Sequence, residues 1–327
     1  MKRISTESSP GRKKLSETEF KKRVFAYTAI LPVILIFGFV RIVPIFQNFL
    51  YSFFQSTIGN PLQQFIGFTN FKDLFADDLF VLSLRNTTYF AVFVTLFSVA
   101  FAVLLAALLS TRSKASAFYE TIYFLPVITP MVPVAVVWKW IYDPTYGLRN
   151  YVLSWVGIEP IGWLVFPNTA MVAIIIMSVW KIVGYNMIIF LVGMRDIPES
   201  YIEAARIDGA STMQVFWRII MPLLRPIMLF VLVISTINSY NVFTQVFIMT
   251  SGPQGAPGNA VRTIVFDIYE NAFRYFRTGY AAAEAVVLFL IILALTLLQF
   301  GISGNKERRE KRRLLRKGGL VDRKSVV

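Results

Sequence analysis

The chain has 327 residues, of which 56% are hydrophobic, against about 45–50% in soluble globular domains. It contains no cysteine and no histidine, which excludes disulfides, thiolate nucleophiles, cysteine-based metal sites and the usual neutral-pH general base. No stretch matches G-x-x-x-x-G-K-[ST], so a phosphate-binding loop of that type is also excluded, and we predict a membrane protein that is not an enzyme and has no cofactor or metal.

Long runs with few charges predict an all-α membrane protein. A helix needs about 20 residues to cross about 30 Å of hydrocarbon. Six runs meet or nearly meet this length, and we predict transmembrane helices at about 24–46, 86–111, 118–141, 169–194, 223–250 and 282–303. The third run contains Pro126, Pro130 and Pro133, so we expect that helix to bend or loosen.

The distribution of positive charge predicts the orientation. Most of the 33 Lys and Arg residues fall in a basic N-terminal segment (1–23), the loop after the second run, the segment 195–222 and a basic tail (304–327). Cytoplasmic loops are enriched in Lys and Arg, so we expect both termini and 195–222 to be cytoplasmic, with the tail near anionic lipid. The first run is longer than the apolar core of a signal peptide, so we expect it to remain uncleaved. The net charge of +14 thus indicates topology, and we predict no nucleic-acid partner.

Three loops on the opposite side, 47–85, 142–168 and 251–281, are rich in aromatic residues, Gly and Pro. They could form a surface for an extracytoplasmic partner, or they could be interfacial loops with an aromatic belt. The sequence leaves both interpretations open.

The segment 195–222 has the pattern of two short amphipathic helices. Ser200 with Glu203, and Ser211 with Gln214, match capping boxes that start helices. Gly209 lies between them, where a residue with a left-handed backbone conformation can end the first helix. Apolar residues recur at helical spacing in the second helix, before Pro222 interrupts the amide ladder; these are Met213, Phe216, Trp217, Ile220 and Met221.

This constellation resembles the EAA loop of permease subunits of ATP-binding-cassette (ABC) importers. Glu203-Ala204-Ala205, Gly209 and Met221-Pro222 stand at the spacing of that family's Glu-Ala-Ala, Gly and Leu-Pro, with Met221 replacing the usual Leu. Asp143-Pro144, Gly147 and Asn150 resemble an Asp-Pro-x-x-G-x-x-N pattern of the sugar-importer branch, typified by maltose permeases. A turn at Ser251-Gly252 also fits, although Pro253 follows directly. The resemblance extends over about 24–303.

The resemblance implies a type I ABC importer permease fold in the plasma (inner) membrane. It implies ABC ATPase subunits, a second homologous but distinct permease (a heterodimer), an extracytoplasmic solute-binding protein and a sugar or related polyol as substrate. The residues expected to contact the ATPase are Glu203, Ala204, Ala205, Asp208, Gly209, Met213, Phe216 and Trp217. Glu203 could instead cap its helix, and the alanines could reflect helix propensity alone. The large extracytoplasmic insertion of the maltose prototype is absent, because 47–85 is too short to hold a domain.

Polar residues in the fifth run are candidates for a substrate path. Ser235, Asn238, Asn241 and Gln245 fall roughly on one helix face, and polar side chains inside hydrocarbon usually face the bundle interior. Helix–helix hydrogen bonding is the alternative. By the resemblance, Asn238 and Asn241 stand where the maltose permease contacts its sugar. Weaker candidates in the fourth run are Ser178, Trp180 and Tyr185.

Lys181 is an intramembrane charge, which could pair with a carboxylate on a partner subunit. A self-sufficient secondary transporter or channel is the rival function, and it would require embedded carboxylates or inverted repeats. The middle of each run lacks Asp and Glu, with Glu120 and Glu284 only at the edges. A membrane-anchored signalling protein would need a soluble output domain, which neither tail can hold.

Overall fold

The computed structural model describes residues 17–57, 59–111, 113–250 and 259–322. The first 16 residues of the basic N-terminal segment, the expected turn at Ser251-Gly252-Pro253 and the last five residues of the tail lie outside the described residues. The chain divides into two compact units, the first ending at Leu50 and the second starting at Tyr51.

The first unit is one nearly continuous helix. It consists of α1 (Glu17–Phe37), the π-helical turn η1 (Gly38–Ile42) and α2 (Val43–Tyr51), whose last residue is the first of the second unit. Its apolar part, Val24–Tyr51, is 28 residues long and extends past the predicted end at 46. None of the described side chains in this stretch is buried, which suits a helix whose surroundings are lipid or other membrane helices.

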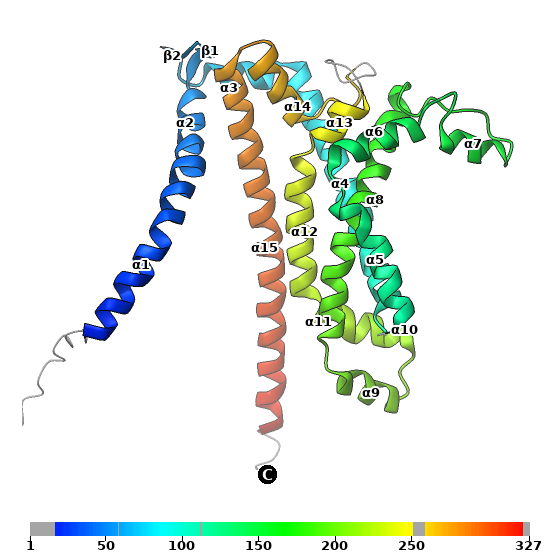
Figure 1. Cartoon of the computed structure of the whole chain (residues 1–327). Coiled ribbons are helices and arrows are strands. Elements are labelled where there is room, and N and C mark those ends of the chain that lie inside the picture. Colours follow the sequence, from blue (N-terminus) through cyan, green and yellow to red (C-terminus); the bar gives the residue numbers. More distant parts are fainter. Residues whose placement is uncertain (1–16, 58, 112, 251–258, 323–327) are drawn as a thin grey trace, which may run out of the picture. The chain divides into compact units, whose positions relative to one another are not determined.

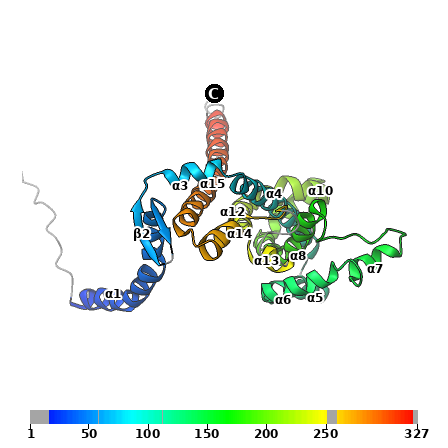
Figure 2. The same cartoon turned by 90° about the horizontal axis from the view of Figure 1, so that it is seen from above.

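The second unit is a bundle of long helices with short elements at both ends (Figures 1 and 2). Its small sheet is an antiparallel hairpin in which Phe54 pairs with Phe65. In chain order the elements are β1 (Phe54–Thr57), β2 (Asn60–Phe65), α3 (Thr69–Ala76), α4 (Asp78–Leu109), α5 (Lys114–Ile128), α6 (Met131–Ile141), α7 (Leu148–Ser154), α8 (Pro167–Arg195), α9 (Glu199–Ile207), α10 (Thr212–Val215), η2 (Phe216–Ile220), α11 (Met221–Leu223), α12 (Arg225–Tyr240), α13 (Thr244–Met249), α14 (Ile264–Tyr269), η3 (Glu270–Arg274) and α15 (Thr278–Asp322).

Four helices in the described part of the chain are long and apolar enough to cross a membrane: Val24–Tyr51, α4, α8 and Thr278–Ile302 of α15. Two further pairs meet the same test but are bent. α5 and α6 meet at 100°, and the segment Thr212–Leu223 meets α12 at 68°. The structure thus has six candidate spans if each bent pair counts as one.

The predicted bend in the third run is confirmed, and its place is specific. α5 ends at Ile128, and Pro130 precedes the first residue of α6. Proline lacks an N–H and disfavours helical geometry in the residue before it, here Thr129, which is extended. Pro133 lies in the first turn of α6, where a missing N–H costs little.

The prediction of one continuous helix over 223–250 is wrong. α12 ends at Tyr240, the chain leaves helical geometry, and the short helix α13 begins at Thr244. Asn241 is at the break, where its side-chain amide donates to the carbonyl of Ile237 at 2.8 Å. Asparagine side chains compete in this way with the backbone ladder and so favour helix ends.

Close packing holds the long helices together. α8 lies between α4 and α5, and a Cβ placed on Gly184 of α8 would be 1.9 Å from the carbonyl oxygen of Tyr123 on α5. Small residues permit such backbone contact between membrane helices. In the interior, the Asn186 amide donates to Ser98 at 3.3 Å and to Ser235 at 3.1 Å, which joins α8 to α4 and α12.

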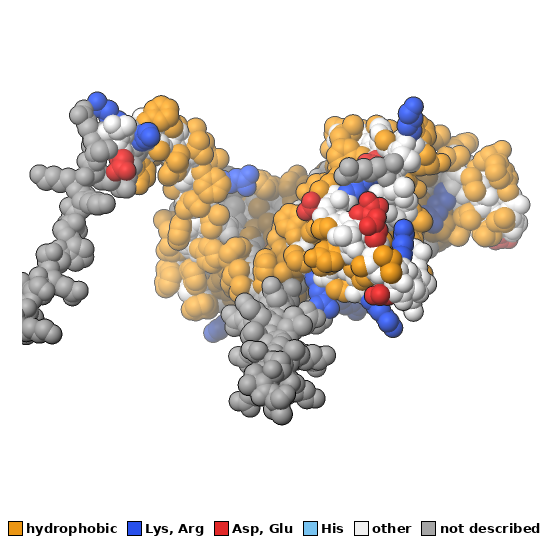
Figure 3. Space-filling view, turned by 90° about the horizontal axis from the view of Figure 1, so that it is seen from below, with side chains coloured by type: hydrophobic (Ala, Val, Ile, Leu, Met, Phe, Trp, Pro, Cys, Tyr) orange, Lys and Arg blue, Asp and Glu red, His pale blue; other side chains and the backbone are white. Residues whose placement is uncertain are grey.

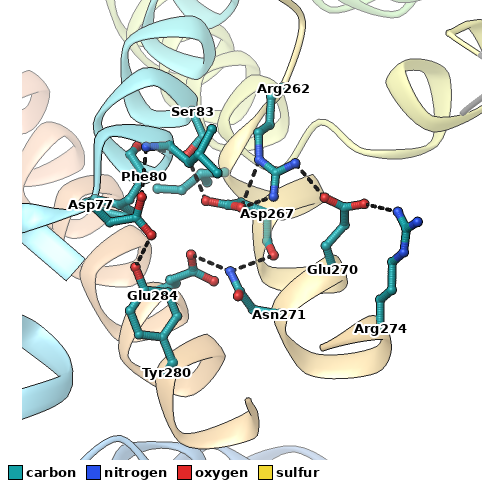
Figure 4. A network of polar contacts seen from close by, with 12 residues as sticks. Asp77, Phe80, Ser83, Arg262, Asp267, Glu270, Asn271, Arg274, Tyr280 and Glu284 are labelled. Atoms are coloured by element: carbon teal, nitrogen blue, oxygen red, sulfur yellow. Dashed lines mark hydrogen bonds and ion pairs between the residues drawn. The ribbon is translucent and has the colours of Figure 1, made fainter. Parts of the chain in front are cut away.

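A buried ionic network fixes the end of the bundle that carries α14 (Figure 4). Arg262 pairs with Asp267 and Glu270, and all three side chains are less than 5% exposed. Asn271 donates to Glu284 of α15 at 3.1 Å. The network therefore ties α14 and η3 to the last long helix.

Replacing Arg262 with Met should destabilise the protein strongly. Removing one partner of a buried ion pair leaves uncompensated buried charge and costs about 3–5 kcal/mol. We expect a clear fall in the thermal unfolding midpoint of the purified complex. Arg274→Met is the matched control, because Arg274 also pairs with Glu270 but its side chain is 41% exposed, and exposed pairs contribute about 0–1 kcal/mol. Equal losses in both variants would contradict the importance of the buried network.

Candidate functional site

Two helix breaks border one cavity of about 440 Å³. The α5–α6 break contributes to one wall and the α12–α13 break to another, while α4 and α8 complete the lining. The lining residues are Phe90, Val94, Val127, Met131, Ser178, Lys181, Ile182, Tyr185, Asn238, Ser239, Asn241, Val242, Phe243, Thr244 and Gln245. No carboxylate is among these described residues.

Lys181 supplies hydrogen-bond donors to the carbonyl groups at the α5–α6 break. The last carbonyls of a helix have no intrahelical partner, and Pro130 cannot supply an N–H. The Lys181 ammonium donates to the carbonyls of Pro126, Val127 and Thr129, the last two at 3.1 and 2.6 Å. An ammonium has three donors, so all of them have acceptors within the chain. Lys181 thus stabilises the bent wall, and pairing with a partner's carboxylate is not needed to explain it.

The α12–α13 break presents amide side chains. Asn238 and Asn241 are both exposed, while Gln245 on α13 is buried and its amide lies 3.5 Å from the Ser178 hydroxyl. Backbone groups at the break also find partners: the Thr263 hydroxyl donates to the carbonyl of Val242 at 3.2 Å. The break therefore opens amide groups to the cavity without leaving that carbonyl unsatisfied.

The substrate-path candidates separate into two groups. Those that line the cavity are Asn238, Asn241, Gln245, Ser178 and Tyr185. Ser235 is fully buried against Asn186 instead. Trp180 packs 5.4 Å from Trp138, between ring centroids, and borders a separate apolar hollow of about 570 Å³ between α4 and α8.

Sequence reasoning missed Ser239, Thr244 and Phe243 in the cavity wall. All three lie at the α12–α13 break or beside it. The signal available was the polar run Asn238-Ser239-Tyr240-Asn241, which contains poor helix formers inside an otherwise apolar stretch.

In the segment 195–222, α9 begins at Glu199, one residue before Ser200, which was expected to cap the helix. The prediction of a capping box at Ser200 and Glu203 is therefore wrong, because Pro198 occupies the cap position and Ser200 is already helical. Glu203 lies in the second turn with its side chain exposed, so helix capping does not account for it.

The second capping box is confirmed. The Ser211 N–H donates to the Gln214 side chain at 2.8 Å, and the Gln214 N–H donates to the Ser211 hydroxyl at 3.4 Å. Gly209 has φ +81°, and the N–H of Ala210 donates to the carbonyl of Ala205 at 2.9 Å. This is a Schellman ending, in which glycine is favoured because it adopts positive φ without strain.

The apolar stripe after Gly209 divides between core and surface. Phe216, Ile220 and Met221 pack against the cluster that includes Phe190, whereas Met213 and Trp217 are 65% and 59% exposed. The π-helical turn η2 shifts the register here, so not all stripe residues share one face.

We call Tyr201, Ile207, Met213 and Trp217 the elbow surface, since these exposed side chains lie on the two arms that meet at Gly209. Ala204 and Asp208 are exposed beside it and Ala205 is half-buried. Figure 3 views the bundle from this end and shows acidic, basic and hydrophobic side chains interspersed. No residue of α9 is buried, and all of them lie within the described part of the chain. The elbow surface is thus apolar, charged at its margins and uncovered.

The Asp-Pro-x-x-G-x-x-N motif builds a loop at the opposite end. The Asp143 carboxylate accepts from the N–H groups of Tyr146 and Thr145 at 2.9 and 2.8 Å, and these donors lower the pKa of that carboxyl. A Cβ on Gly147 would be 2.3 Å from the Asp143 carbonyl oxygen. Asn150 accepts from the Trp163 indole at 3.0 Å. In this structure these residues hold the loop in shape.

The family described as "Binding-protein-dependent transport system inner membrane component" matches residues 98–304. The chain is 34% identical to the probable ABC transporter permease protein YurN of Bacillus subtilis (strain 168), over 85% of this chain and 96% of the relative. It is 31% identical to the sn-glycerol-3-phosphate transport system permease protein UgpA of Agrobacterium fabrum, over 86% of this chain and 95% of the relative.

The fold is also similar to that of a solved complex. A chain in the crystal structure of a bacterial ABC transporter involved in the import of the acidic polysaccharide alginate aligns with a TM-score of 0.78 and 25% identity. The alignment covers 88% of this chain and 98% of the other.

Proposed function

Because this chain belongs to the family of binding-protein-dependent transport system inner membrane components, we propose that its cavity passes a sugar or related polyol. The chain is a multi-pass inner-membrane permease subunit of an ABC importer, a transport component and not an enzyme. It acts with ATPase subunits and a solute-binding protein.

The chemistry of the cavity supports a carbohydrate solute. Amides from Asn238, Asn241 and Gln245 can exchange hydrogen bonds with hydroxyl groups, and the Tyr185 ring offers an apolar face for a sugar. The Lys181 donors are already used by carbonyls, which leaves the amides as the main recognition groups. The relatives named for sn-glycerol-3-phosphate and alginate transport also concern polyol or sugar compounds.

For the topology we propose six spans, with each bent helix pair counted as one. The distribution of basic residues supports a topology in which both termini and the elbow surface are cytoplasmic, with segment 1–23 and tail 304–327 flanking a permease domain at 24–303. The basic tail would lie near anionic lipid.

For the mechanism we propose that the elbow surface docks onto an ABC ATPase, with Glu203, Asp208 and the Glu-Ala-Ala helix at the contact. A second, homologous but distinct permease would close the cavity in which Asn238 and Asn241 are exposed. Closure of the ATPases on ATP would move the elbow, and the path would switch from inward-open to outward-open. The observation that carries this proposal is the uncovered elbow surface at the opposite end from the Asp143 loop.

Removing the two exposed anchors should release the ATPase. We expect the double variant Met213→Ala with Trp217→Ala to reduce the amount of ATPase retained on the purified permease at least tenfold. A few large side chains that become buried when two proteins bind, tryptophan above all, supply most of the binding energy of an interface. Trp155→Ala is the matched control, since Trp155 is 70% exposed on the loop that includes α7. Retention of the ATPase by the double variant would contradict docking at this surface.

A self-sufficient transporter is tested in the same preparation. Vesicles that contain the permeases without the ATPase should show no solute accumulation, and vesicles with the ATPase, ATP and loaded binding protein should show it. Accumulation without the ATPase would favour the rival.

A further inference from the structure

Arg195, the last residue of α8, joins three helix ends. Its guanidinium donates to Glu120 on α5 at 2.7 and 3.4 Å, which is a bidentate pair. It also donates to the carbonyl of Leu109 on α4 at 3.0 Å and to the Ser116 hydroxyl at 3.1 Å. Arg195 therefore both caps the end of α4 and holds the first half of α5.

This junction is partly shielded from water. The side chains of Arg195 and Glu120 are 23% and 21% exposed, so the pair is screened less than a surface ion pair. The Ser116 hydroxyl donates to Glu120 at 2.8 Å, which fixes the carboxylate from a second direction, and the Ser116 N–H donates to the Ser113 hydroxyl at 3.0 Å. Bidentate arginine–carboxylate pairs are directional as well as strong.

α8 holds α5 at three levels. The guanidinium of Arg195 binds Glu120 near the start of α5, Gly184 meets the Tyr123 carbonyl in its middle, and Lys181 binds the carbonyls at its end. Between Lys114 and Ile128 the helix is unbroken. Two helices attached at three levels move together more readily than they slide past each other.

The same residue is next to the elbow. Only Asp196, Ile197 and Pro198 separate Arg195 from the start of α9. At the far end of α5, Val127 and the α5–α6 break line the cavity. A displacement of α9 would therefore be transmitted to Arg195 through three residues of backbone. From Arg195 it would pass through non-covalent contacts to α5, and along α5 to the cavity wall.

We propose that the Arg195–Glu120 pair is the joint that transmits movement of the elbow surface to the α5–α6 wall of the cavity. Arg195 is a positioning residue, since it touches neither the solute cavity nor the exposed elbow surface. This inference rests on the proposed function, because it requires an ATPase that moves the elbow.

The test uses the complete importer in vesicles, with loaded binding protein added. The measured quantity is the ratio of stimulated to basal ATP hydrolysis. For Arg195→Gln and Glu120→Gln we expect assembly and basal hydrolysis to persist while the ratio falls at least fivefold, and solute uptake to fall with it. The exchange variant, Arg195→Glu with Glu120→Arg, should recover part of the ratio, because the charges are again opposite. Arg274→Gln is the control, with an ion pair at the other end of the bundle.

An unchanged ratio in Arg195→Gln would overturn the proposal. So would loss of assembly in both Arg195→Gln and Arg195→Lys, because the pair would then serve structure alone. Absence of stimulation in the unaltered complex would instead count against the proposed function, which keeps the two failures distinguishable.

Discussion

Replacing Gly209 with proline is expected to abolish ATP hydrolysis that depends on the loaded binding protein, while the chain still inserts in the membrane. Gly209 has φ +81°, whereas the proline ring fixes φ near −65°. The Gly209 N–H, which donates to the Arg206 carbonyl at 3.0 Å, would also be lost. The two arms of the elbow would then meet at a different angle, and the elbow surface could not dock as one patch.

The matched control is Gly157→Pro. Gly157 has φ +74°, its N–H donates to the Ser154 carbonyl at 3.1 Å, and no heavy atom approaches its Cβ position within 4 Å, as for Gly209. It lies in the loop after α7, outside the elbow. We expect Gly157→Pro to keep most of the stimulated hydrolysis. Stimulated hydrolysis at the normal rate in Gly209→Pro would contradict the role of the elbow.

The second large effect is expected at the cavity. Asn238→Ala should weaken solute uptake about five- to tenfold and Asn241→Ala by a similar factor, with a greater loss in the double variant. A net hydrogen bond contributes about 0.5–1.5 kcal/mol, and about 1.4 kcal/mol corresponds to a factor of ten. Uptake of labelled solute into vesicles, measured over a range of binding-protein concentrations, gives these factors.

Ser235→Ala is the control for the cavity. Ser235 is on the same helix but its hydroxyl faces Asn186 and is fully buried, so its loss should affect stability more than the preference among solutes. Unchanged uptake in both asparagine variants would reject the proposed substrate path, even if the importer hydrolyses ATP normally.

The helices could be predicted from sequence where apolar length alone decides. α4, α8 and the first part of α15 carry long apolar runs. α4 and α15 begin a turn or more before their predicted spans, because polar residues can continue a helix outside the membrane, whereas α8 departs from its predicted span by no more than two residues at either end. Hydropathy averages over about 20 residues, so it cannot place a break such as that at Asn241. The prolines around residue 130 predicted a bend, but its angle depends on α8 and on Lys181.

At the elbow, local chemistry was informative where it was fully local. Gly209 and the Ser211 capping box involve residues within a few positions, and both were predicted correctly. Ser200 was misassigned because Pro198 starts α9 earlier, and a proline and a serine so close together compete for the same helix start. Which stripe residues face the core could not be predicted, since the π-helical turn after Val215 changes the register.

Contacts between residues far apart in the chain could not be predicted from the sequence. Arg195 and Glu120 are 75 positions apart, and Asn186 meets Ser98 and Ser235 from two other helices. Only the packing of α8 against α4, α5 and α12 brings these groups together. The same holds for Glu284, which was placed at a span edge but lies fully buried in the Figure 4 network.

The most direct test of the whole account is the side of the membrane on which Glu203 lies. Because the chain has no cysteine, Glu203→Cys carries a single thiol for a membrane-impermeant maleimide, and Tyr146→Cys, at an 80% exposed position near the Asp143 loop, is its counterpart. In intact cells the account predicts labelling of Tyr146→Cys only, with Glu203→Cys reacting after the membrane is opened and more slowly when the ATPase is bound. Labelling of Glu203→Cys from outside intact cells would contradict the account.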